Sequence, residues 1–203
     1  MHGFDSLSKF LIIFVFLVSC LSFYENTSEN FYTRVSIEED MSFLDMKIIR
    51  EEGATEQHIE RAKHEMMKLP TKLWKQFFLN GGILILTTKN LHDEDGCIVG
   101  SFSIENLADI KIFVNVDYIE YSLCNEFSHY LYYVDEIKDF KGYREFLYER
   151  DTVWKNLMNS NYYFFSESEY FAEAGKLYFK GEIDPSKYPK TEMFFNTITS
   201  KYK

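Results

Sequence analysis

The chain has 203 residues, a length typical of one compact domain, and its 20 Phe and 15 Tyr residues can fill a sizeable core. Its formal charge is −10 and its pI is near 5.0. Because nucleic-acid affinity depends on Lys and Arg displacing counterions from phosphates, we expect no nucleic-acid partner. The acidic excess fits solubility, or a basic protein partner.

The N-terminus predicts export. Residues 10–18 form an apolar run after Lys9, shorter than the roughly 20 residues that span a bilayer, so we interpret residues 1–20 as a signal peptide. The run ends in LVSC, which resembles a bacterial lipobox with Cys20 as the lipidated residue. The alternative is an ordinary signal peptide with a chance cysteine. We therefore expect a secreted or extracellular protein that meets a membrane only through its signal or a lipid anchor.

Residues 21–50 are predicted to be a flexible leader, and residues 51–203 the folded domain. The domain begins with two predicted helices, over residues 55–69 and 73–79, which have apolar residues at helical spacing. Strands are predicted over residues 83–87, 98–104 and 110–115, which gives a small sheet. Helices follow near residues 118–133, 143–158 and 166–178.

Two partial metal motifs lie on predicted helices. His64 and Glu65 begin an HExxH pattern, but Lys68 replaces the second histidine, and a protonated lysine binds no metal, so we interpret this match as chance. Residues 125–129 read NEFSH. In zinc peptidases, HExxH works because residues four apart share one helical face, so two histidines bind one metal. On its own, NEFSH also fits an ordinary polar helix face.

A second motif lies downstream, where residues 166–174 read SESEYFAEA. It places Glu169 and Glu173 one helical turn apart, which is where a third metal ligand would come from. Ser166 and Glu169 also match a capping box, in which the glutamate only satisfies the helix start. Position alone does not separate these two interpretations.

Taken together, NEFSH and the downstream EYFAEA resemble the catalytic domain of the anthrax lethal factor family, whose relatives include small secreted Pro-Pro endopeptidases. That family has HExxH and a downstream E-[FY]-F-A-E-A. The resemblance covers roughly residues 55–200, including residues 69–91 and a closing helix near residues 188–195. It implies an α+β, zincin-like metallopeptidase domain, with a small mixed β-sheet packed against helices that carry the active-site motifs.

The resemblance also implies roles for individual residues. His129 and Glu169 match zinc ligands, and Glu126 matches the general base that activates the zinc-bound water. Tyr162 matches the tyrosine that stabilises the oxyanion, although the adjacent Tyr163 is an alternative.

Asn125 departs from the family pattern, because it stands at the first ligand position. A neutral amide oxygen is a poor zinc ligand beside imidazole nitrogen, and catalytic zinc sites normally have three good protein donors. Cys124 does not simply replace the missing metal ligand, because one helical step turns its side chain about 100° away from that of Asn125. We expect Cys124 and Cys97 to be structural thiols. Glu173 matches an acceptor near the first ligand, here the Asn125 amide. We therefore expect weak or absent zinc binding.

Two functions fit these observations. The favoured one is a pseudopeptidase with impaired zinc binding and catalysis that binds a protein or peptide, as the lethal factor family also contains a docking copy of the fold without histidines. The alternative is an active zinc metalloendopeptidase, with Glu126 as general base and His129 and Glu169 as ligands. A third interpretation is a surface lipoprotein whose main role is to hold the domain near the membrane.

Overall fold

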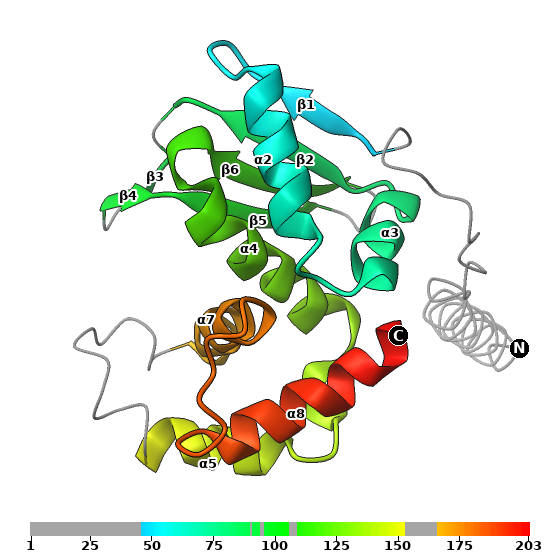
Figure 1. The fold of residues 1–203 in the computed structure, drawn as a ribbon, viewed down its shortest axis with the longest axis vertical. Helices are drawn as coiled ribbons and strands as arrows, with labels where there is room; N and C mark the ends of the chain where they lie inside the picture. The colour runs from blue at the N-terminus through cyan, green and yellow to red at the C-terminus, as the bar shows by residue number, and fades with distance from the viewer. Residues whose placement is uncertain (1–45, 90, 94–95, 106–108, 153–165) are drawn as a thin grey trace, which may run out of the picture. The chain divides into compact units, whose positions relative to one another are not determined.

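The computed structural model describes residues 46–203 apart from residues 90, 94–95, 106–108 and 153–165. The predicted signal peptide and most of the predicted leader lie outside this range, as do Tyr162 and Tyr163. The described residues form an α+β fold with six α-helices and a four-stranded mixed sheet (Figure 1). Within this part of the chain, no helix is both long and apolar enough to cross a membrane.

The sheet has the strand order β1-β2-β6-β5, with bounds Ile48–Arg50, Ile83–Thr87, Asp109–Asn115 and Gly100–Glu105 respectively. The first three strands in this order are parallel, and β5 runs antiparallel to β6 at an edge. A separate antiparallel hairpin consists of β3 (Leu91–Asp93) and β4 (Gly96–Ile98). The short strand β1 lies inside the span that the sequence predicts to be leader.

Three helices follow the predicted pattern around this sheet: α2 (Glu56–Met66), α3 (Thr71–Leu79) and α4 (Ile119–Val134). The alternate side chains of β2 and β6 that face inward are fully buried in the hydrophobic core; they are Leu84, Leu86, Ile112 and Val114. Alternate residues of a strand point to the same face of the sheet, so these four side chains lie on one face. The helices pack against this face (Figure 1).

The second half of the domain is helical. It contains the short 3-10 turn η3 (Ile137–Asp139), then α5 (Tyr143–Thr152), α7 (Glu167–Phe179) and α8 (Pro189–Thr199), and ends in the 3-10 turn η5 (Ser200–Tyr202). Its core is aromatic: the buried ring of Phe146 stacks on Tyr170 and on Phe194, with centroids 4.6 and 4.8 Å away. Stacked rings of this kind add to the stabilisation from burial alone.

A carboxylate from α5 caps the start of α8. Glu149 is only 4% exposed, and its two oxygens accept hydrogen bonds from the backbone N–H groups of Lys190 (3.0 Å) and Thr191 (2.8 Å). These N–H groups belong to the first turn of α8, which has no intrahelical acceptor for them. Glu149 thus ties α5 to α8.

Helices α4 and α7 pack very closely, and a glycine permits this. A Cβ atom at Gly175 would lie 2.4 Å from Ser128 Oγ, 2.9 Å from Ser128 Cβ and 3.1 Å from Phe195 Cε1. The Ser128 hydroxyl in turn donates to the Cys124 carbonyl, at 2.7 Å. Since α4 carries the NEFSH motif and α7 the EYFAEA motif, this contact brings the two motifs together.

Candidate functional site

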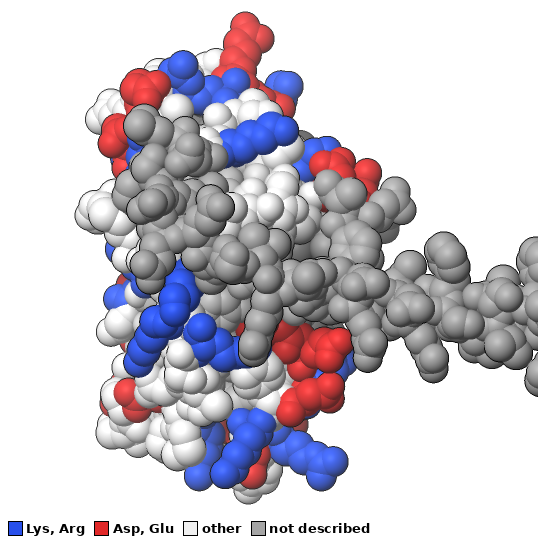
Figure 2. Space-filling view, turned by 90° about the vertical axis from the view of Figure 1, so that its right-hand side faces the viewer, with Lys and Arg blue, Asp and Glu red and all other residues white. Residues whose placement is uncertain are grey.

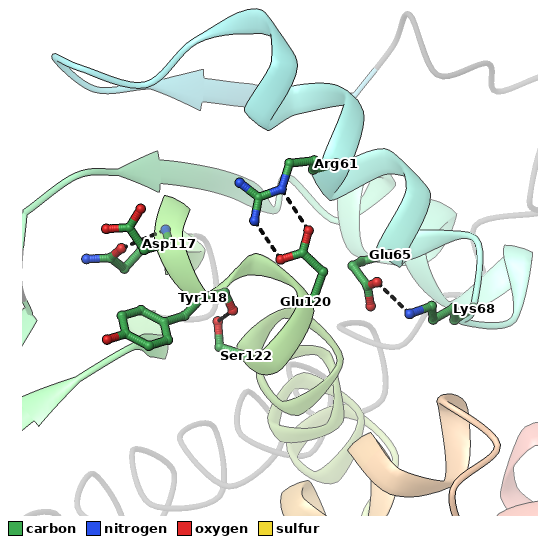
Figure 3. Close-up of polar contacts among 8 residues, drawn as sticks. Arg61, Glu65, Lys68, Asp117, Tyr118, Glu120 and Ser122 are labelled. Carbon is green, nitrogen blue, oxygen red and sulfur yellow. Dashed lines mark hydrogen bonds and ion pairs between the residues drawn. The ribbon is translucent and has the colours of Figure 1, made fainter.

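Polar contacts fix where α4 begins and how it lies against α2. Strand β6 ends at Asn115, whose side chain accepts a hydrogen bond from the Asp117 N–H (2.9 Å) in the 3-10 turn η2 (Val116–Tyr118). Arg61 on α2 then donates two hydrogen bonds, of 2.7 and 2.6 Å, to the two oxygens of Glu120 in the first turn of α4 (Figure 3). This paired geometry is directional, so it helps to set the rotation of α4 about its axis.

Glu169 takes part both in the start of α7 and in the site. The Ser166 side chain is the N-cap of α7 and accepts a hydrogen bond from the Glu169 N–H at 3.4 Å. The carboxylate of Glu169 lies against α4, with Oε2 3.4 Å from His129 Nε2. The Glu169 N–H therefore takes part in the helix cap, while its carboxylate faces His129, as the ligand interpretation expects; in a capping box this carboxylate would instead turn to the Ser166 N–H.

His129 is 9% exposed, and its environment favours the protonated ring. Burial alone would lower the pKa of this imidazole, but the hydrogen bond with Glu169 and the negative charges of Glu126 and Glu169 raise it by more, so the net pKa is raised. The pair thus behaves as an ion pair across the two helices.

Glu126 is a buried carboxyl group that lies against strand β5. It is 5% exposed, and burial raises its pKa to about 7; the charge of Glu169 also raises the pKa, whereas His129 and a hydrogen bond from the Phe102 backbone N–H lower it. The carboxylate packs beside Gly100, where a Cβ atom would lie 2.7 Å from Glu126 Oε1. A carboxyl group with a pKa near neutrality is suited to taking or giving a proton.

Glu173, which the sequence analysis offered as a partner of the Asn125 amide, takes part in a buried ion pair. Both oxygens of Glu173 lie 2.6 Å from Lys176 Nζ, and Lys176 is 3% exposed. The Lys176 ammonium also lies 3.9 Å from the ring centroid of Tyr121. Tyr121 lies on α4 one turn before Asn125, and His129 lies one turn after Asn125, so the three residues share one face of the helix. Glu173, the acceptor that the sequence analysis expected for the Asn125 amide, is therefore already paired with Lys176.

Sequence reasoning missed three groups at this site. The pairing of Lys176 with Glu173 could have been predicted from the sequence, because Lys176 follows Glu173 by three residues, a spacing at which side chains on a helix meet. No sequence pattern indicated that Gly100 and Phe102 lie beside Glu126, because this proximity depends on where β5 crosses α4.

Glu65 and Cys124, two further candidates from the sequence, do not join this site. On α2, the buried Glu65 is held by Lys68, with Oε1 2.5 Å from Nζ (Figure 3). Cys124 is a buried thiol, and burial raises its pKa to about 12, so it is a poor thiolate donor. Tyr162 and Tyr163 lie outside the described residues.

The donor set only partly fits a zinc ion. Two donors bound to one zinc at about 2.0–2.2 Å in tetrahedral geometry lie about 3.4 Å apart, which is the separation between His129 Nε2 and Glu169 Oε2. Among the residues that the structure describes, however, no three His, Cys, Asp or Glu side chains are grouped so that they could hold a metal. Asn125 supplies only an amide oxygen, and Glu173 is engaged by Lys176. The arrangement fits a weak two-donor site and does not fit the three-donor set of tight catalytic zinc.

Comparisons of the chain with protein-family models, with curated proteins and with solved structures gave no match. The resemblance to the lethal factor family therefore rests on the sequence motifs alone and stays a prediction.

Proposed function

We propose that this chain is an exported pseudopeptidase with a lethal-factor-like, zincin-type fold, whose former catalytic cleft binds a protein or an extended peptide. Its zinc binding and catalysis are impaired. In this proposal the chain is secreted or held at the membrane by a lipid on Cys20, and it has no nucleic-acid partner.

One observation carries the proposal. Glu126, His129 and Glu169 converge from two helices, as peptidase residues would, while Asn125 stands where the third donor is needed. Loss of groups that merely support metal ligands costs roughly 10- to 100-fold in affinity, and loss of a ligand itself should cost more. The geometry therefore supports a peptidase-like arrangement of side chains with weak metal affinity.

The edge of the sheet beside Glu126 offers a place for a peptide. The Asn115 N–H donates to the Val99 carbonyl across the β5–β6 pair, at 3.0 Å. Because successive residues of a strand alternate in direction, Gly100, Phe102 and Ile104 turn their backbone polar groups away from β6, to the outer edge of β5. An extended peptide can bind such an edge as an added strand.

Aromatic groups near this edge, and the mixed charge on the face drawn in Figure 2, are compatible with a protein or peptide partner. The ring of Phe102 stacks on Tyr133 of α4, with centroids 5.5 Å apart, and Tyr133 is 53% exposed. On the described surface visible in Figure 2, Lys and Arg side chains lie in small groups among Asp and Glu. Such a surface suits the mixed side chains of a protein better than the uniform charge of a nucleic-acid backbone.

The alternative, an active zinc metalloendopeptidase, is favoured by the 3.4 Å separation of His129 Nε2 and Glu169 Oε2. Zinc, if bound, would supply Lewis acidity. The contribution of the chain would be His129 and Glu169 as ligands and Glu126 as the group that holds and moves a proton.

Zinc titration separates the two functions. We would measure zinc stoichiometry and affinity by calorimetry on the purified chain, with Asn125→His as the variant that restores the third donor and His129→Ala as the variant that removes one. We expect Asn125→His to bind zinc at least about 100-fold more tightly than the wild type. If the wild type itself binds one zinc tightly, and His129→Ala abolishes this binding, the proposal is wrong and the peptidase is the better hypothesis.

A further inference from the structure

Two polar contacts join facing surfaces of α4 and α7. The residues on these two surfaces, spaced three or four apart along each helix, are Tyr121, Asn125 and His129 on α4, and Glu169, Glu173 and Lys176 on α7. At one end, His129 Nε2 lies 3.4 Å from Glu169 Oε2. At the other end, the Lys176 ammonium lies 3.9 Å from the ring centroid of Tyr121. Because these contacts bracket the middle residue of each surface, Asn125 and Glu173 face each other.

The Lys176 side chain is enclosed where it meets Glu173. Both are buried, and the ammonium lies 2.6 Å from each of the two carboxylate oxygens. The Tyr121 ring covers the same ammonium, and such a cation–π contact is strongest where water is excluded. A buried charge that left its partners would stay desolvated without compensation, which is strongly unfavourable. Lys176 and Glu173 are therefore held to each other.

A histidine at position 125 would need the carboxylate that Lys176 holds. A metal-binding histidine donates its second ring N–H to a carboxylate, a backbone carbonyl or water, and loss of that partner costs roughly 10- to 100-fold in metal affinity. Glu173 is the carboxylate that faces position 125. Both of its oxygens already accept from a charged donor, so its negative charge is compensated before any metal arrives.

We propose that Lys176 is a second barrier to metal binding, separate from Asn125: its ammonium neutralises Glu173, so this carboxylate does not support a metal ligand at position 125. The inference rests on the proposed function, in which a former metal site lies between these helices. Asn125 takes away a donor, whereas Lys176 supplies within the chain the positive charge that a metal would bring. Lys176 is thus a positioning residue that acts on metal affinity through Glu173.

Zinc affinity of the purified chain in an Asn125→His background tests this role. Lys176→Met removes the ammonium, and adding Glu173→Gln removes the carboxylate as well. Lys180→Met is the charge-matched control, because Lys180 is a second lysine on the same helix end and pairs with Glu182, at 3.2 Å. Circular dichroism establishes that each variant is folded before calorimetry begins.

The carboxylate that Lys176→Met releases should strengthen the new ligand. We expect Asn125→His/Lys176→Met to bind zinc at least about 10-fold more tightly than Asn125→His alone. Addition of Glu173→Gln should abolish this gain, and Lys180→Met in the Asn125→His background should not produce it. Equal affinity with and without Lys176→Met would overturn the inference. A gain of the same size from Lys180→Met would also overturn it, because the effect would then be one of net charge.

A second variant covers the case in which Lys176→Met does not fold, since removing one partner of a buried ion pair is strongly destabilising. Lys176→Gln keeps an N–H donor beside Glu173 without the charge. Hydrogen bonds to neutral donors are about half as strong as charge-assisted ones, so we expect about half the effect in free energy, or about a 3-fold gain over Asn125→His. No gain from Lys176→Gln would contradict the role of the ammonium.

The same titrations separate this inference from the proposed function. If Asn125→His binds zinc more tightly than the wild type and Lys176→Met adds nothing, only the inference about Lys176 is wrong. If zinc binds tightly only when both changes are present, Lys176 is the stronger of the two barriers. If neither Asn125→His nor the double variant exceeds the wild type, the former metal site is wrong, and the inference fails with it.

Discussion

Replacing Gly175 with Ala tests whether the close approach of α4 and α7 is a requirement of the fold. Within a helix, Ala is more favourable than Gly by about 1 kcal/mol, so intrinsic propensity alone predicts a more stable protein. The structure predicts the opposite, because the new Cβ would lie 2.4 Å from Ser128 Oγ and 2.9 Å from Ser128 Cβ. Overpacking of a core typically costs 1–3 kcal/mol. With contacts this short we expect the upper end, and hence a net loss of about 2 kcal/mol.

The assay is urea unfolding followed by circular dichroism, on the wild type, Gly175→Ala, Ser128→Gly and the double variant. Moving the glycine from α7 to α4 restores space between the helices, so we expect the double variant to be more stable than the sum of the single changes predicts, by at least about 1 kcal/mol. A Gly175→Ala protein as stable as the wild type, or more stable, would refute the reasoning. Such a result would mean that α4 and α7 can move apart without lowering the free energy of unfolding.

Three further predictions concern individual side chains. Glu149→Ala should lower the free energy of unfolding by about 2–4 kcal/mol in urea, because two N–H groups at the start of α8 lose a charged acceptor, and Glu149→Gln should lose about half as much. Cys124, with a pKa of about 12, should react with iodoacetamide at least about 100-fold more slowly in the native protein than in urea, as followed by peptide mass spectrometry; equal rates would contradict its burial. The hydrogen bond with Arg61 lowers the pKa of Glu120 below its usual 4.5. The contribution of this ion pair to the free energy of unfolding is therefore present above pH 4.5 and is lost as the pH falls through the lowered pKa. Because Glu120 is half exposed, Arg61→Met should cost no more than about 1 kcal/mol at pH 7 and nothing near pH 2, as measured by unfolding at both pH values.

Elements with a strong local pattern were predictable from the sequence. The apolar run of β2 was predicted with the bounds Ile83–Thr87 that the structure shows, and α3 and α4 begin and end within two residues of the prediction. Strand β1 was missed, because it has only three residues and ends in an exposed arginine. The predicted strand over residues 98–104 is divided in the structure, with β4 ending at Ile98 and β5 beginning at Gly100. That division depends on which neighbours each part pairs with, and periodicity does not contain this information.

The candidate site was predictable to a similar extent. The resemblance of NEFSH and EYFAEA to the lethal factor motifs implied that His129 and Glu169 lie together, and in the structure His129 Nε2 lies 3.4 Å from Glu169 Oε2. The burial of the Glu173–Lys176 ion pair, and the contact of Glu126 with β5, depend on how elements distant in the chain pack together. Such features require the tertiary structure, because the same residues on an isolated helix would be solvated.

The buried ion pair of Glu173 and Lys176 also restricts how this chain can evolve. Removing one partner of a buried pair costs about 3–5 kcal/mol, whereas replacing both with well-packed apolar residues is often neutral. A loss of that size is a large part of the 5–15 kcal/mol that stabilises a typical domain. Descendants of this sequence are therefore expected to keep the acid and the base together or to lose them together, and covariation between positions 173 and 176 would be the record of that constraint.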